Sequence, residues 1–167
     1  LAQRPGAIDY AGGRYRMVGS GPVLASGTSL TTLGSNLSGP VSYLRGVEIL
    51  PDGEIWAVGD KNLVLRSVDG GTTWALVDTG QPATKNWKGL ASGLGYIYLI
   101  PTSGGGYYYS SDGVAFTFSD GFSPQQILFT GTKLVAFSYG GVSYESTDGI
   151  NWSPAATPDA TISNVIY

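Results

Sequence analysis

The stretch Ser67-Val68-Asp69-Gly70-Gly71-Thr72-Thr73-Trp74 decides the fold of this chain, because the same pattern returns twice further along. The later copies are Ser110-Ser111-Asp112-Gly113-Val114-Ala115-Phe116 and Ser146-Thr147-Asp148-Gly149-Ile150-Asn151-Trp152. A degenerate copy comes earlier, at Ser26-Gly27-Thr28-Ser29-Leu30, where the Asp is missing and Leu stands in the aromatic position. The chain is therefore built from repeated units.

A second, apolar segment precedes each copy of this pattern. The segment 55–59 is echoed by residues 15–19, 96–100 and 134–138. Counting from Gly19 to Gly59, Pro101 and Ser138 gives spacings of about 40, 42 and 37 residues, which is the length range of β-propeller blades.

Each unit is predicted to form four short strands joined by tight turns. The units span residues 5–34, 43–79, 87–120 and 125–154. In the second unit we expect strands at 44–50, 54–58, 63–67 and 74–77, with a turn at Pro51-Asp52-Gly53. Pro presets φ in such a turn, Asp binds backbone amides and Gly accepts positive φ. In the first unit the fourth strand is expected at 30–33.

A further first strand is predicted at residues 161–167, which match the start of a unit. Three arrangements remain open for it. The strand closes a four-bladed ring, or it belongs to a longer propeller, or another subunit completes the ring.

The pattern at residues 67–74 resembles the Asp-box, or BNR, repeat of β-propellers. That repeat occurs in sialidases, sortilin-like receptors, photosystem assembly factors and many bacteriophage virion proteins. The form at residues 146–152 is most similar to repeat proteins of phage virions and bacterial exoproteins. The resemblance spans nearly the whole chain and implies an all-β propeller of four-stranded antiparallel blades. Because unrelated activities share the repeat, the resemblance does not settle function.

The repeated carboxylates are expected to be structural. They occupy the turn between the third and fourth strand of a unit and are Asp69, Asp112 and Asp148. A carboxylate there can accept hydrogen bonds from the turn's own amides. The aromatic residues that follow are expected to pack between adjacent sheets, and they are Trp74, Phe116 and Trp152. A metal or acid–base cluster is the alternative, but the repeat places these carboxylates on different blades.

Composition excludes several kinds of site. The 167 residues contain 26 Gly and 12% aromatic residues, which favours many short strands with tight turns over disorder. The absence of Cys and His removes disulfides, Ser-His-Asp triads and the commonest transition-metal ligands. With 9 Lys and Arg against 12 Asp and Glu, nothing favours a nucleic-acid partner. The apolar stretch 96–100 is too short to span a bilayer, and no cofactor or metal is expected.

Two surface features are candidates for binding. If the first strands line a central channel, Arg45, Lys88 and Gln126 share one level near its mouth, with Trp87 beside Lys88. Such a polar ring with an aromatic residue suits an anionic or sugar ligand. Alternatively, these groups only solvate the channel and Trp87 packs on a neighbouring blade. The second candidate is Tyr108, which strand alternation places opposite its two Tyr neighbours, although core packing also explains such a run.

Catalysis has little support in the sequence. None of the five Arg residues lies in the Arg-Ile-Pro context that marks sialidases. Convergence of Arg45 and Arg66 with two carboxylates and a Tyr in one cleft would favour such an enzyme. The carboxylates with unknown mutual distances are Glu48, Glu54, Asp60 and Asp120.

The sequence therefore predicts a non-catalytic binding or assembly propeller on a phage particle or a bacterial surface. Its expected partners are other protein subunits and a surface glycan, and it is expected to belong to a larger assembly or a homo-oligomer. The alternative is a fragment of a sialidase-like, glycoside-active enzyme whose catalytic residues lie partly outside this chain.

Overall fold

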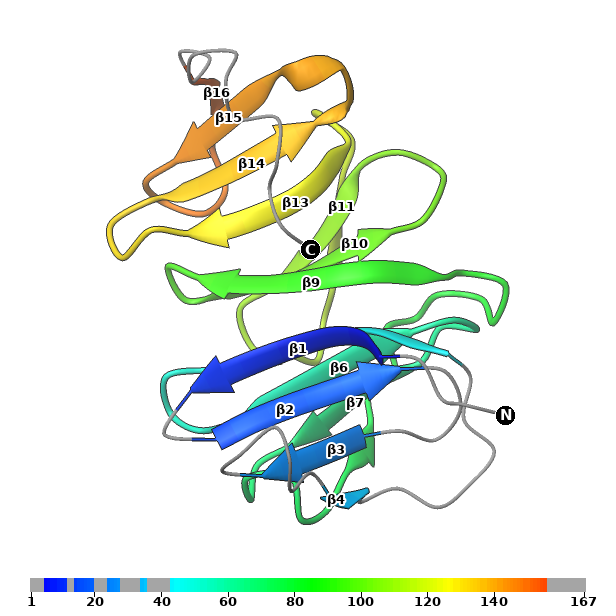
Figure 1. Cartoon of the computed structure of the whole chain (residues 1–167). Helices are drawn as coiled ribbons and strands as arrows, with labels where there is room; N and C mark the ends of the chain where they lie inside the picture. Colours follow the sequence, from blue (N-terminus) through cyan, green and yellow to red (C-terminus); the bar gives the residue numbers. More distant parts are fainter. Residues whose placement is uncertain (1–4, 12–13, 20–23, 28–33, 36–42, 156–167) are drawn as a thin grey trace.

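The computed structural model describes residues 5–11, 14–19, 24–27, 34–35 and 43–155 (Figure 1). These residues form four four-stranded antiparallel sheets, each taking its strands consecutively from the chain. No α-helix occurs in the described part, where the single helical element is a 3-10 turn at Tyr139–Gly141. The prediction of an all-β chain of four-stranded antiparallel sheets is confirmed.

The strands keep the order of the repeat. The first sheet holds β1 (Pro5–Ala11), β2 (Arg14–Gly19), β3 (Leu24–Gly27) and β4 (Gly34–Ser35). The second holds β5 (Leu44–Ile49), β6 (Ile55–Gly59), β7 (Val64–Ser67) and β8 (Ala75–Leu76). The third holds β9 (Trp87–Gly93), β10 (Tyr96–Pro101), β11 (Tyr107–Ser110) and β12 (Thr117–Ser119). The fourth holds β13 (Pro124–Phe129), β14 (Leu134–Ser138), β15 (Ser143–Ser146) and β16 (Ser153–Pro154).

Two predicted strands fall on residues that the structure does not describe. The described fourth strand of the first sheet is Gly34–Ser35, and the segment 30–33 predicted for it lies outside the described residues. The strand predicted at 161–167 lies outside the described residues.

The first strands of neighbouring sheets lie side by side. In Figure 1 the sheet β13–β16 is at the top and the blue sheet β1–β4 near the bottom, with β9 between them. β1 packs on β5, β5 on β9, and β9 on β13. Among the described strands, β1 and β13 make no comparable contact with each other. The four sheets therefore form an arc whose inner edge consists of first strands.

Aromatic residues fill the spaces between sheets. Trp152 of the fourth sheet packs on Tyr98 and Tyr107 of the third, with ring centroids 6.3 and 6.2 Å apart. Phe116 packs in the same way on Trp56 of the preceding sheet, at 6.5 Å. Trp74 packs against the cluster that also includes Ala7 of β1. Phe116 and Trp152 thus wedge their sheets against the preceding ones, and Trp74 packs on the core cluster of its own sheet that Ala7 also contacts.

In the second, third and fourth sheets, the third strand ends in a turn that is held by the Asp of the repeat. Asp69 accepts hydrogen bonds from the backbone N–H groups of Thr72 and Thr73 and from the hydroxyls of Ser67 and Thr73. The Thr73 contacts contribute most to lowering the pKa of Asp69 to about 2. Asp148 makes the equivalent turn, and the side chain of Asn151 is the main cause of its lowered pKa.

Asp112 differs from the other two in one oxygen. Its Oδ1 accepts hydrogen bonds from the N–H groups of Val114 and Ala115, which lower its pKa, and from the hydroxyl of Ser110. Its Oδ2 has no partner among the described residues, because Ala115 stands where the other turns have Thr73 and Asn151. This turn therefore leaves one carboxylate oxygen available.

Ala115→Thr is expected to stabilise the chain modestly. Its hydroxyl would donate to Oδ2 of Asp112 as Thr73 donates to Asp69, so the melting temperature should rise by about 1–3 °C. Thermal unfolding followed by circular dichroism measures this. Val114→Thr is the control, since the equivalent Thr72 hydroxyl bonds only a backbone carbonyl. An equal gain in both variants would contradict the explanation.

Candidate functional site

Each first strand carries a β-bulge at the same level. The register shifts between Pro5 and Ala7, between Leu44 and Gly46, between Trp87 and Gly89, and between Pro124 and Gln126. The extra residues are Gly6, Arg45, Lys88 and Gln125. Bulges redirect side chains and are common beside functional sites. We call the end of the arc that carries them the bulge end, and the opposite end, with the Asp turns, the Asp end.

Arg45 is held by an ion pair. Its Nε and Nη2 donate to Oδ1 and Oδ2 of Asp60, at 2.7 and 2.9 Å, and this hydrogen bonding raises the pKa of the guanidinium. Asp60 follows β6, and its backbone N–H donates to the carbonyl of Tyr43. The bidentate contact fixes the direction of an otherwise exposed side chain.

Lys88 lies between two groups of the fourth sheet. Its Nζ donates to Oε1 of Gln125 at 2.7 Å and lies 5.7 Å from the ring centroid of Tyr139. Partial burial lowers the pKa of this ammonium. Tyr139 itself is 76% exposed. The ammonium therefore has a neutral acceptor and an aromatic face beside it, and an incoming anion would supply the missing counter-charge.

Asn62 anchors the segment that leads into β9. Its Oδ1 accepts hydrogen bonds from the indole of Trp87 at 3.1 Å and the hydroxyl of Thr79 at 2.8 Å. Its backbone N–H donates to the carbonyl of Lys85 at 2.6 Å. The Lys85 ammonium lies 5.0 Å from the ring centroid of Tyr108. The side-chain amide and backbone of Asn62 thus fix the segment 85–88, which carries Lys85 and Lys88, against the second sheet.

The structure corrects three of the sequence-predicted site residues. Trp87 is fully buried in a core cluster shared with residues of the second sheet, and its indole donates to Asn62, so the packing alternative holds for it. Tyr108 is 7% exposed, because the second sheet covers its face of β11, and its hydroxyl donates to Gln81. The residue level with Arg45 and Lys88 is Gln125 and not Gln126, because the bulge shifts the register by one residue.

The two ends of the arc differ in charge. Among the described residues of the second, third and fourth sheets, the bulge end carries the cations Arg45, Lys61, Lys85 and Lys88, with Asp60, Asp78 and Asp120 as its carboxylates. In the second, third and fourth sheets, the Asp end carries the carboxylates Asp52, Glu54, Asp69, Asp112, Glu145 and Asp148, against Arg66 and Lys133. Anionic and cationic ligands are therefore favoured at opposite ends.

The predicted enzyme site does not assemble in the described part of the chain. Arg66 forms its ion pair with Glu54 at the Asp end, at 2.7 Å, whereas Arg45 pairs with Asp60 at the bulge end. Glu48 lies on β5 and accepts hydrogen bonds from the backbone N–H and hydroxyl of Ser92. Three or more potential metal ligands do not cluster anywhere within the described ranges. Nor does any helix there have the length and apolar character needed to cross a membrane.

Comparison with solved structures places this arrangement among known folds. The chain aligns with YCF48 bound to D1 peptide at a TM-score of 0.67 and 18% identity, over 93% of this chain and 55% of that one. It aligns with the Niastella koreensis GH74 enzyme at 0.76 and 15%, over 92% and 24%. Virginiamycin B lyase from Staphylococcus aureus with quinupristin gives 0.72 and 15%, over 95% and 57%.

The fold is that of a β-propeller. The chain spans about half the length of the YCF48 chain that it matches. No protein-family model matches the sequence, and no curated protein matches it either. The propellers that it is similar to include both an enzyme and a peptide-bound protein, so the fold alone does not separate catalysis from binding.

Proposed function

We propose that this propeller is a non-catalytic binding and assembly protein that holds an anionic group of a partner protein at its bulge end. The observation that carries the proposal is the repeated bulge, which places Arg45, Lys88 and Gln125 level on successive first strands. The sequence-based expectation of a phage particle or bacterial surface as its location remains part of this proposal.

Close approach of the first strands supports a single site. A Cβ atom at Gly46 would lie 3.1 Å from the Cα atom of Gly89, so the residues after two of the bulges are nearly in contact. Arg45 and Lys88 immediately precede these glycines. Lys61 and Lys85 follow on the surrounding loops, which are tied together by the hydrogen bond from the Lys61 N–H to Asn86. Because Arg45 already pairs with Asp60, a carboxylate at this end would be attracted chiefly by Lys61, Lys85 and Lys88, none of which forms an ion pair with another described residue.

A glycan is the second candidate, and exposed tyrosines favour it. Tyr43 is 57% exposed and Tyr139 is 76% exposed at the bulge end, and aromatic faces stack on sugar rings. The buried Trp87 no longer supports this candidate. An acidic sugar would bind the same cations as a protein carboxylate. The two candidates are therefore distinguished by testing different ligands, because substitution of these residues would weaken both.

The test is a titration of the chain with a Glu-rich peptide, acetylated and amidated so that only side chains carry charge. Lys88→Gln is expected to weaken binding about tenfold, because it removes the cation between Gln125 and Tyr139. Isothermal titration calorimetry at low and at physiological salt measures this, and salt should weaken wild-type binding.

Lys133→Gln is the matched control. It removes a lysine at the Asp end that pairs with Glu145, and it should leave peptide binding unchanged. A peptide with Gln in place of every Glu should bind weakly, and sialyllactose against lactose tests the glycan candidate. Equal loss of binding in the two lysine variants, or equal binding of the Glu and Gln peptides, would overturn the proposal.

A further inference from the structure

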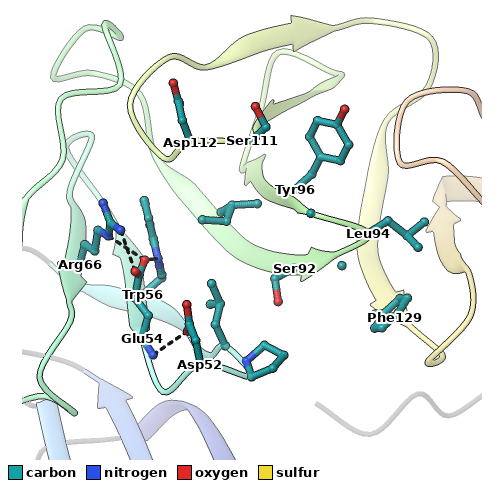
Figure 2. Close-up of a pocket in the computed structure, with 15 residues that line it drawn as sticks. Asp52, Glu54, Trp56, Arg66, Ser92, Leu94, Tyr96, Ser111, Asp112 and Phe129 are labelled. Atoms are coloured by element: carbon teal, nitrogen blue, oxygen red, sulfur yellow. Dashed lines mark hydrogen bonds and ion pairs between the residues drawn. The ribbon is translucent and has the colours of Figure 1, made fainter.

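A pocket of about 450 Å³ opens at the Asp end, between the second and third sheets, and Phe129 of the fourth sheet completes its lining. Figure 2 shows Glu54, Trp56 and Arg66 on one side of it, and Leu94, Tyr96 and Phe129 on the other. Its volume lies in the range of small-ligand sites. The bulge-end residues do not line it, so it is separate from the site described above.

The walls of the pocket are largely apolar. Phe129 is 44% exposed, and Leu94 and Tyr96 are half-buried beside it. Leu94 has φ +54° and is followed by Gly95 with φ +82°, which makes a two-residue hairpin turn of the kind that favours Asn-Gly. Leu is unusual at such a φ. The turn thus places an apolar side chain at the pocket where a polar residue would suit the backbone better.

Two carboxylates of the pocket stand outside the ion pairs of the described residues. Arg66 donates to both carboxylate oxygens of Glu54, and the indole of Trp56 donates to the same carboxylate. Arg66 is held by Glu54 and is also attracted by Asp52 at longer range. Asp52 and Asp112 also line the pocket, both are exposed, and neither forms an ion pair with another described residue.

Asp112 is suited to an external donor. Oδ1 holds the turn, whereas Oδ2 accepts no hydrogen bond from the described residues, unlike the equivalent oxygens of Asp69 and Asp148. The turn that faces the pocket is therefore the one whose carboxylate is not fully used by its own turn. An ammonium or guanidinium group is the donor that gains most from a free carboxylate oxygen.

We propose that this pocket binds a basic side chain within an apolar peptide segment. The apolar part of the segment packs on Leu94, Tyr96 and Phe129, while the cation pairs with Asp112 and Asp52. The charge of the Asp end favours approach of this ligand and disfavours an anionic one. The site is distinct in place and in ligand charge from the bulge end, so either proposal can fail alone.

The probe is the acetylated tripeptide amide Leu-Arg-Phe, with Leu-Gln-Phe and Leu-Glu-Phe as matched controls. Two-dimensional NMR of the ¹⁵N-labelled chain reports the site, because the indole N–H of Trp56 lies at the pocket and that of Trp87 at the other end. We expect the Arg peptide to shift the Trp56 signal saturably and to leave Trp87 unchanged. The Gln peptide should bind about tenfold more weakly, and the Glu peptide should not bind.

Two variants test the charged contact and the apolar contact separately. Asp112→Asn keeps the acceptor Oδ1 that holds the turn but removes the charge, and Leu94→Asn keeps the turn conformation but removes the apolar contact. Each should weaken the Arg peptide about fivefold or more. Asp120→Asn removes an exposed carboxylate outside the pocket and should have no effect.

Phenethylammonium separates the possible sources of the ligand. If phenethylammonium shifts the Trp56 signal, a cation on an apolar body is sufficient for binding. If only the Arg peptide shifts this signal, the site is assigned to peptides. Equal binding of the Arg and Glu peptides overturns the proposal. So does a shift at Trp87 in place of Trp56, or an Asp120→Asn effect equal to that of Asp112→Asn.

Discussion

Gly59→Ala is expected to destabilise the chain by about 3–5 kcal/mol, the largest effect of any single methyl group that we predict. A Cβ atom at this buried position would lie 2.0 Å from the carbonyl oxygen of Tyr43 and 2.9 Å from the Cα atom of Leu44. Both contacts are with backbone, so no side-chain rotation relieves them. A shift of Tyr43 would also break the hydrogen bond that its carbonyl accepts from the N–H of Asp60. Asp60 is the residue whose carboxylate holds Arg45.

Gly89→Ala is the matched control for this prediction. It adds the same methyl group on a neighbouring sheet, where no atom lies within 4 Å of the new Cβ and φ is not positive. Its stability should stay within about 1 kcal/mol of the wild type. Urea unfolding of the wild type and the two variants measures these stabilities. Similar urea midpoints for Gly59→Ala and the wild type would contradict the close approach of Gly59 to the backbone of Tyr43.

The stability of the chain is expected to fall as pH rises from 5 to 8, because of Glu48. Burial raises the pKa of Glu48 to about 7, against the opposing hydrogen bonds from Ser92, and the nearby charge of Asp9 adds to the rise. The folded chain therefore binds this proton more tightly than the unfolded chain. The resulting stability is fully present below the unfolded pKa, near 4.5, and is lost as pH passes through 7. The full loss is about 3 kcal/mol.

Glu48→Gln tests this directly. The amide keeps an acceptor for the Ser92 N–H and carries no charge, so the decline between pH 5 and 8 should disappear. Ser92→Ala removes one hydrogen bond to the carboxylate and should move the decline to higher pH. Chemical unfolding at several pH values measures both. A decline of the same size in Glu48→Gln would assign it to other groups, although the low pKa of Asp69 places its own transition well below this range.

Most of the fold could be predicted from local signals that repeat. The pairing of an Asp turn with an apolar segment located the four strands of the second sheet and the spans of the third and fourth, because turn chemistry and strand alternation are properties of neighbouring residues. In the first unit, where the pattern has lost its Asp, the predicted fourth strand at 30–33 lies outside the described residues, and the described strand is Gly34–Ser35.

The candidate site was predicted less well, for two physical reasons. A bulge inserts one residue without a sequence signature, so Gln126 was chosen where the structure aligns Gln125 with Lys88. Burial of Trp87 and Tyr108 depends on the neighbouring sheet, which no pattern within their own strands reports. The pocket at Leu94 joins three sheets, and its only sequence signal was a Leu-Gly turn where Asn-Gly is usual.

The bulges have a consequence for how binding specificity can change. A residue that stands outside the ladder contributes no strand pairing, so its side chain can be exchanged with little effect on the blade that carries it. The four such positions already hold a hydrogen atom, a guanidinium, an ammonium and an amide, at Gly6, Arg45, Lys88 and Gln125. The blades thus act as a fixed frame with interchangeable contact positions, and a library randomised at these four residues would vary recognition while leaving the scaffold intact.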